Sequence, residues 1–266
     1  MNGVTRVIFM RREYNPPSSM GAQNIYDDPD FFAGYARLPR SELGLSAVFE
    51  WPAFQRLLPA SLRDARVLDL GCGLGYFARE ARARGAREVV AVDLSERMLQ
   101  AARARTDDTG IVYLRAPLEQ FEPERSAFDL VVSSLALHYV ADYVGVVRRV
   151  AACLVPGGRF VFSVEHPIYT ALGTADWHTG PDGAALHWPV DRYRDEGERR
   201  TRWFVEGVVK YHRTMETYVN VLLGSGLTLV RLEEPEAEAA LLAERPALRE
   251  ERRRPPFLLL AADRPR

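Results

Sequence analysis

The chain has 266 residues, of which 47% are hydrophobic, and its 35 basic and 36 acidic residues give a formal net charge of −1. This length suffices for one large domain with a substantial core, and the balanced charge argues against a protein that holds nucleic acid through bulk positive charge. Two cysteines, Cys72 and Cys153, cannot make a disulfide framework, and no apolar run reaches the roughly 18 residues of a membrane span, so we expect a cytoplasmic protein.

The first elements are predicted from proline and aspartate positions. Residues 1–20 have no sustained period and contain Asn15-Pro16-Pro17, so we expect a flexible N-terminal arm followed by a single domain over 21–266. Asp28-Pro29 is a typical helix start, with aspartate as the cap and proline in the first turn. A second short helix is predicted over Ala47–Leu58, ended by Pro59.

Strands and helices then alternate. The predicted strands cover 66–70, 88–92, 111–114, 128–132 and 159–164, and the predicted helices between them cover 75–85, 95–105 and 140–153. Short apolar strands separated by helices are typical of βαβ units, which form a parallel sheet with helices on both faces. This predicts a doubly wound α/β domain.

The alternation is interrupted over 165–210, a segment rich in aromatic and turn residues. A connection of this length is usually functional, so we expect a substrate lid inserted after the fifth strand. Beyond it we predict a helix over 214–223, a strand over 227–232, a helical stretch over 236–250 broken at Pro246, and a last strand over 257–262.

The strongest motif runs from Asp69 through Gly71 and Gly73 to Gly75, between the first strand and its helix. Ligands bind at this edge of open α/β sheets, and glycines let the backbone approach them closely. The spacing is G-x-G-x-G, whereas a dinucleotide site has G-x-G-x-x-G. A carboxylate at Asp69 would repel a pyrophosphate but attract an ammonium or a sulfonium. The motif therefore favours a cationic adenosyl ligand over a nicotinamide dinucleotide.

Asp93 ends the second strand, eighteen residues after Gly75. An acidic side chain there can accept hydrogen bonds from both ribose hydroxyls. Because Ser95 begins a helix, the alternative is a charge that only stabilises the helix N-terminus.

Four segments in this order, VLDLGCGLG, VDLS, FDLVVSSLALHYV and LVPGGRFVFSVEHP, resemble class I S-adenosylmethionine-dependent methyltransferases of the bacterial small-molecule type. The resemblance extends from about Asn24 to Ala262. It implies a Rossmann-like seven-stranded sheet in the order 3-2-1-4-5-7-6 with strand 7 antiparallel. The implied cofactor is S-adenosyl-L-methionine, which leaves as S-adenosyl-L-homocysteine.

The resemblance also assigns cofactor-binding residues. The glycine loop, with Asp69, Gly71, Cys72 and Gly73, would hold the methionine part; Asp93 would bind the ribose, with Leu94 against the adenine; and the segment after the fourth strand, with Ser133 and Ser134, would meet the methionine ammonium. Pro117 stands where relatives often have an acidic residue for the adenine amino group, so only the N–H of Leu118 remains for the ring. The N-terminal helix would close over the cofactor with Tyr26, Tyr35 and Arg40, although Arg40 is nearly as well explained as a solvated surface residue.

Three residues on the substrate side are candidates for catalysis. His138 follows the fourth strand and can act as a base near pH 7, and Glu165 and His166 follow the fifth strand. Each also has a purely structural explanation, as a hydrogen-bonded histidine or as turn residues before Pro167. The aromatic residues of the lid, and Tyr211 just beyond it, either stack on a flat substrate or fill a small core of their own. Those of the lid are Tyr169, Trp177, Trp188 and Trp203.

Together these features predict a methyltransferase for a small aromatic or heteroaromatic metabolite. The sharper hypothesis is methylation of an indole ring carbon in natural-product biosynthesis, with His138 as base assisted by Glu165. A cofactor-binding scaffold without activity and a nicotinamide oxidoreductase remain as alternatives. We expect a monomer or homodimer with no metal and no membrane or nucleic-acid partner.

Overall fold

The computed structural model describes residues 22–266 of the chain. The predicted N-terminal arm over 1–20, including Asn15-Pro16-Pro17, lies outside these residues. Within residues 22–266 no helix is long and apolar enough to cross a membrane.

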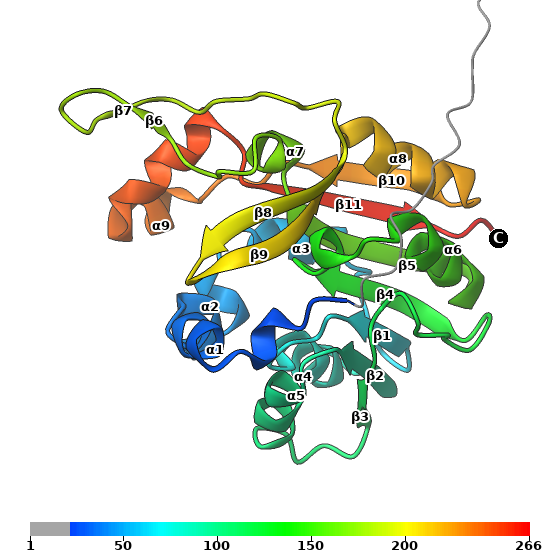
Figure 1. Cartoon of the computed structure of the whole chain (residues 1–266). Coiled ribbons are helices and arrows are strands. Elements are labelled where there is room, and N and C mark those ends of the chain that lie inside the picture. Colours follow the sequence, from blue (N-terminus) through cyan, green and yellow to red (C-terminus); the bar gives the residue numbers. More distant parts are fainter. Residues whose placement is uncertain (1–21) are drawn as a thin grey trace, which may run out of the picture.

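A seven-stranded sheet forms the centre of the fold (Figure 1), in the order β3-β2-β1-β4-β5-β11-β10. Its strands are β1 (Arg66–Leu70), β2 (Glu88–Asp93), β3 (Ile111–Arg115), β4 (Phe128–Ser134), β5 (Leu154–Glu165), β10 (Thr228–Glu233) and β11 (Phe257–Asp263). The pairs from β3 to β5 are parallel, whereas β11 is antiparallel to both β5 and β10. This is the predicted order, with β10 and β11 as the sixth and seventh strands.

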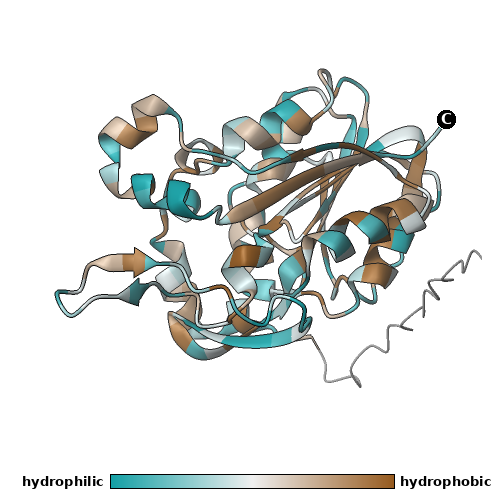
Figure 2. Cartoon of the chain, turned by 90° about the horizontal axis from the view of Figure 1, so that it is seen from above, coloured by the Kyte–Doolittle hydropathy of each residue, from teal (hydrophilic) through white to brown (hydrophobic). Residues whose placement is uncertain are grey.

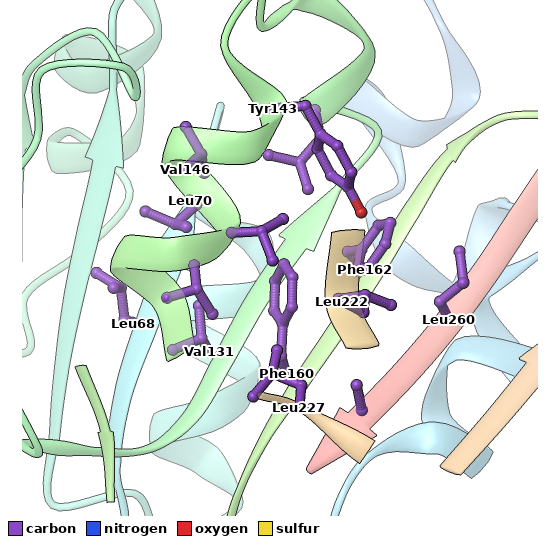
Figure 3. Close-up of a cluster of buried hydrophobic side chains, with 14 of the residues drawn as sticks. Leu68, Leu70, Val131, Tyr143, Val146, Phe160, Phe162, Leu222, Leu227 and Leu260 are labelled. Atoms are coloured by element: carbon purple, nitrogen blue, oxygen red, sulfur yellow. The ribbon is translucent and has the colours of Figure 1, made fainter. Parts of the chain in front are cut away.

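Helices cover both faces of the sheet because neighbouring strand residues point to opposite sides. Leu68 and Leu70 of β1 join a core with α6 (Tyr143–Cys153) and α8 (Met215–Gly224), shown in Figure 3. Val67 joins the opposite core with α3 (Trp51–Leu57), α4 (Tyr76–Ala83) and α5 (Glu96–Arg103). In Figure 2 the central strands are brown, as expected for strands that are buried on both faces.

The predicted helix caps are confirmed. Asp28 caps α1 (Pro29–Ala36) by accepting hydrogen bonds from the N–H groups of Asp30 and Phe31. Ser95 caps α5 by accepting from Met98 N–H. Thr214, which was not predicted as a cap, caps α8 in the same way by accepting from Thr217 N–H. These side chains satisfy N–H groups that have no partner within the helix. The prediction over Ala47–Leu58 was only partly right, because a 3-10 turn, η2 (Leu45–Ala47), precedes a helix that starts at Trp51.

The fifth strand is longer than predicted, because β5 begins at Leu154 and includes the Pro156-Gly157-Gly158 segment as an irregularity in its pairing with β4. The helical stretch predicted over 236–250 is divided into α9 (Ala239–Glu244) and a 3-10 helix, η4 (Pro246–Arg253). The break falls beside Pro246, as expected from its missing N–H.

The segment predicted as a lid contains regular structure that the sequence did not indicate. After α7 (Pro167–Thr170) come two short strands, β6 (His178–Thr179) and β7 (Ala185–His187), and then a hairpin of β8 (Gly197–Trp203) and β9 (Val205–His212). The hairpin, yellow in Figure 1, is a separate two-stranded sheet. Near it lie the remaining N-terminal elements, η1 (Ile25–Asp27) and α2 (Pro39–Glu42), and η3 (Leu137–Tyr139) follows β4.

Candidate functional site

A cavity of about 570 Å³ opens at the carboxyl ends of β1, β2, β4 and β5, under the N-terminal helices and the β8–β9 hairpin. This volume is within the range of small-molecule sites. Most of the predicted site residues line it: Tyr26, Tyr35, Arg40, Gly71, Gly73, Asp93, Leu94, Leu118, Ser134, His138 and Glu165. Asp69, Cys72, Ser133 and His166 do not.

The glycine loop is joined to β2 through Asp93. The carboxylate of Asp93 accepts from Gly73 N–H at 2.8 Å with Oδ2 and from Ser95 N–H at 2.9 Å with Oδ1. Gly71 has a φ of +76°, and a Cβ there would lie 2.3 Å from the Cβ of Ala136. The loop therefore needs glycine at this position, and Asp93 holds it while leaving a second lone pair on each carboxylate oxygen.

Asp69 lies beneath the loop, and only 2% of it is exposed. Its Oδ2 has no hydrogen-bond partner among the described residues. Burial, together with the nearby charge of Asp93, raises the pKa of Asp69 to about 8. The direct contact with the methionine part that the resemblance implied is thus replaced by a buried carboxyl behind the cavity wall, which is mostly protonated at neutral pH.

Two other predicted cofactor residues have structural roles. The fully buried Ser133 hydroxyl donates to Leu70 O at 2.8 Å and so joins β4 to β1. The Cys72 thiol is 3.9 Å from Gly73 O, and burial raises its pKa well above the usual range. Neither side chain reaches the cavity because β-strand alternation and the turn of the loop point them into the protein.

The N-terminal residues predicted to close over the cofactor do lie above the cavity. The Arg40 guanidinium is 3.4 Å from Ser134 Oγ, at the end of β4, and 3.9 Å from the buried carboxylate of Glu50. Tyr26 packs edge-on against Tyr35, with ring centroids 5.1 Å apart, and its hydroxyl donates to the Tyr139 hydroxyl at 3.3 Å. Arg40 is therefore part of the cavity wall and not a solvated surface residue.

At the adenine end the wall is formed by Leu94, Pro117 and Leu118. Glu119, which the sequence did not single out, also lines the cavity and accepts from Ala141 N–H at 3.0 Å with Oε1. Its position two residues after Pro117 was the signal that could have revealed it.

On the substrate side, His138 is 2% exposed, and Glu165 N–H donates to its Nδ1 at 3.4 Å. Burial lowers the pKa of His138 to about 4, although the charge of Glu165 opposes this. The neutral ring therefore carries its proton on Nε2, which makes it a donor. The expected base near pH 7 is thus not supported by the environment of this histidine.

Glu165 and His166 are neighbours in sequence but take different partners. The ring of His166 accepts from Ile168 N–H with Nδ1 and lies 2.8 Å from Glu234 Oε1 with Nε2, so it caps α7. The partner of Glu165 is Lys210, whose Nζ is 2.5 Å from Glu165 Oε1. Although burial acts to raise it, the positive charge of Lys210 holds the pKa of Glu165 below its usual range.

The aromatic residues of the lid separate into two groups. Trp203, at the hairpin tip, lines the cavity and packs edge-on against Phe31 and Tyr35 of α1, with centroids 5.3 and 6.1 Å apart. Tyr169 lines the cavity but stacks on Trp188, which meets Trp177 at 5.3 Å. The guanidinium of Arg254 covers these three rings, so this group forms a small core that attaches the lid to the end of η4.

The residues at the cavity fit an adenosyl sulfonium ligand. The buried carboxyl of Asp69 leaves one oxygen unpartnered behind the glycine loop, where a nearby ammonium or sulfonium would favour its ionised form, and Asp93 retains acceptor capacity at the end of β2. At Gly73 an added Cβ would meet nothing within 4 Å, so the loop borders open space. Within residues 22–266 no cluster of histidine, cysteine and acidic residues could hold a metal ion.

Comparisons with known proteins agree with this geometry. The methyltransferase domain family matches residues 68–162. A solved S-adenosylmethionine-dependent methyltransferase from Mesorhizobium loti is 48% identical with a TM-score of 0.78, over 83% of this chain and all of that one. A solved structure from Listeria monocytogenes, assigned to the same class, is 41% identical with a TM-score of 0.79, over 84% of this chain and all of its own. A ubiquinone biosynthesis O-methyltransferase of Bordetella avium is 38% identical over 109 residues, which cover 40% of this chain and 45% of that enzyme. The fold, the site and these relatives show that the chain belongs to the S-adenosylmethionine-dependent methyltransferases.

Proposed function

We propose that this methyltransferase acts on a small aromatic or heteroaromatic metabolite. The observation that supports this is the substrate end of the cavity, which Trp203, Tyr139 and Tyr169 line together with Glu165. Aromatic walls with one polar group favour a flat substrate that carries one polar atom. Our sharper hypothesis remains an indole ring carbon in natural-product biosynthesis. We keep as predictions a cytoplasmic location, a monomer or homodimer, and no nucleic-acid partner.

The chain's own residues supply alignment and exclusion of water. When bound, S-adenosylmethionine supplies an electrophilic methyl group on a sulfonium that departs as a neutral thioether. Asp93 and the glycine loop fix the donor end, while Tyr26, Tyr35 and Trp203 cover the cavity. Holding an acceptor in line with a donor in a dry site accounts for most of the rate gain in such displacements.

Proton removal falls to Glu165 in this proposal, with His138 in support. Because the donor's bonding pair would stay with the neutral thioether, methyl transfer would leave the acceptor positively charged. Its proton then becomes strongly acidic, so that even a carboxylate of lowered pKa, such as Glu165, can take it. His138, with its proton on Nε2, can donate a hydrogen bond that orients the acceptor.

The test is label transfer from methyl-labelled S-adenosylmethionine to a panel of indoles, phenols and amines, with bulk RNA and protein as competing acceptors. We expect label in one or more small aromatic compounds and none in the macromolecules. Glu165→Gln should reduce the rate of methyl transfer at least tenfold. Arg200→Met changes an exposed residue of the β8–β9 hairpin and should not change the rate. Label found in RNA or protein, and in none of the small compounds, would refute the proposal.

A further inference from the structure

Lys210 occupies an unusual place for a lysine. It lies on β9, is 5% exposed, and lines the cavity with its ammonium 2.5 Å from Glu165 Oε1. The ammonium also lies over the faces of Trp203 and Tyr139, 5.0 and 6.0 Å from the ring centroids. A buried lysine is stable only when its charge is compensated, and here one carboxylate and two ring faces do this.

The choice of lysine at this position is itself informative. Lys210 is the only lysine among the 35 basic residues of the chain. Arginine is a planar fork that would present two donors side by side, whereas lysine is a compact point charge. Between Glu165 and the two rings, Lys210 supplies such a point charge, which engages one carboxylate oxygen and leaves the other without a partner.

The second carboxylate oxygen of Glu165, Oε2, is not engaged by Lys210. Oε2 is buried and has no hydrogen-bond partner among residues 22–266. The neighbouring side chains do not bond this oxygen: His138 Nδ1 accepts the main-chain N–H of Glu165, and Arg254 pairs with Glu251 through Nη1 while its Nε is also unpartnered. A buried carboxylate oxygen without a partner is costly, so a ligand that donates to it gains affinity.

We propose that Glu165, held by Lys210, selects acceptors that donate a hydrogen bond, such as a phenol, an alcohol or a ring N–H, and excludes carboxylates. Glu165 is the specificity-determining residue and Lys210 is its positioning residue. This inference rests on the proposed function, because it assigns the polar group of the substrate in that cavity. A carboxylate acceptor has no proton to donate to Oε2, so it would leave this oxygen unpaired and bring a second negative group against it.

The test measures binding of matched probes to the protein saturated with S-adenosylhomocysteine. Phenol is compared with anisole, its methyl ether, and with benzoate; cyclohexanol is compared with methoxycyclohexane. We expect each alcohol to bind at least about tenfold more tightly than its ether, and benzoate to bind at least about tenfold more weakly than phenol. Phenol binding no tighter than cyclohexanol would count against the aromatic substrate alone, because the alcohol-to-ether ratio is measured separately in the aliphatic pair.

Two variants separate recognition from folding. In Glu165→Gln and Lys210→Met the alcohol-to-ether ratio should fall at least threefold, and the rejection of benzoate should weaken. A merely structural role would lower the affinity of both members of a pair equally and leave their ratio unchanged. Arg200→Met, an exposed cation on β8, is the matched control and should keep the wild-type ratios. Equal binding of alcohols and ethers to the wild type, no detectable binding of either, or unchanged ratios in both variants with normal binding of S-adenosylhomocysteine would overturn the proposal.

Discussion

Replacing Asp69 by asparagine should remove a pH-dependent loss of stability from this protein. The folded pKa of Asp69 is about 8, against an ordinary value of 3.8, because the carboxyl is buried and faces the charge of Asp93. The folded state thus keeps a proton that the unfolded chain releases near pH 4. The stability from this group is fully present below the unfolded pKa and is lost as the pH rises through the folded pKa.

The size of the effect follows from the pKa difference. One pH unit between the two pKa values corresponds to about 1.4 kcal/mol. Between about pH 5 and pH 8 the wild type should therefore lose up to roughly 4 kcal/mol of unfolding free energy relative to Asp69→Asn. The side chain is 2% exposed, so solvent screening reduces this figure little. The neutral amide of asparagine has the shape of the carboxyl, so the substitution should leave the packing around this side chain unchanged.

Urea unfolding of the wild type and Asp69→Asn at several pH values measures this difference directly. The two stability curves should diverge as the pH rises, with the variant the more stable above about pH 6. Above about pH 8, where Asp69 is ionised, the same substitution should lower the preference for S-adenosylmethionine over S-adenosylhomocysteine, because only the former carries a sulfonium for the Asp69 charge to attract. Parallel stability curves, together with an unchanged preference between the two ligands, would refute the reasoning.

Three further substitutions test other parts of the site. Gly71→Ala places a methyl group 2.3 Å from Ala136 at a φ of +76°, so binding of S-adenosylhomocysteine measured by calorimetry should weaken at least about tenfold; unchanged binding would show that the loop can relax. Asp93→Asn puts an amide donor against an N–H of Gly73 or Ser95, so the same assay should again show roughly tenfold weaker binding, and equal affinity would exclude Asp93 from the site. His138, with a pKa of about 4 against 6.5, makes the wild type lose stability as the pH falls between these values. As the pH falls through this range, the unfolding free energy of His138→Gln, measured in urea, should fall by up to about 3 kcal/mol less than that of the wild type. An equal fall in both proteins would contradict the burial argument.

The parts of the site that follow from local pattern were predictable from the sequence. The glycine loop must follow a buried strand and precede a helix, and the spacing of Asp93 places it at the next strand end. Because parallel strands end at one edge of the sheet, their terminal residues meet in space. Helix caps such as Asp28 and Ser95 act over three residues, so their roles were also readable along the chain.

Pairings across the fold were not predictable in this way. Lys210 pairs with Glu165, which lies 45 residues away in the sequence, and His166 pairs with Glu234, which lies 68 residues away. The buried positions of β9 are Val208, Lys210 and His212. Because two of these side chains are polar, the sequence does not show the alternation of apolar and polar residues by which a strand is recognised, and the hairpin was not predicted.

The sequence by itself determined the doubly wound α/β architecture, the ligand edge and the preference for a cationic adenosyl ligand, because these depend on periodicity, glycine spacing and the direction of strands. The strand order followed from the family resemblance. Only the tertiary structure decided which charges are buried, which partner each one takes, and which carboxylate oxygen is left free. Those choices depend on packing and desolvation between segments far apart in the chain, and no local pattern records them.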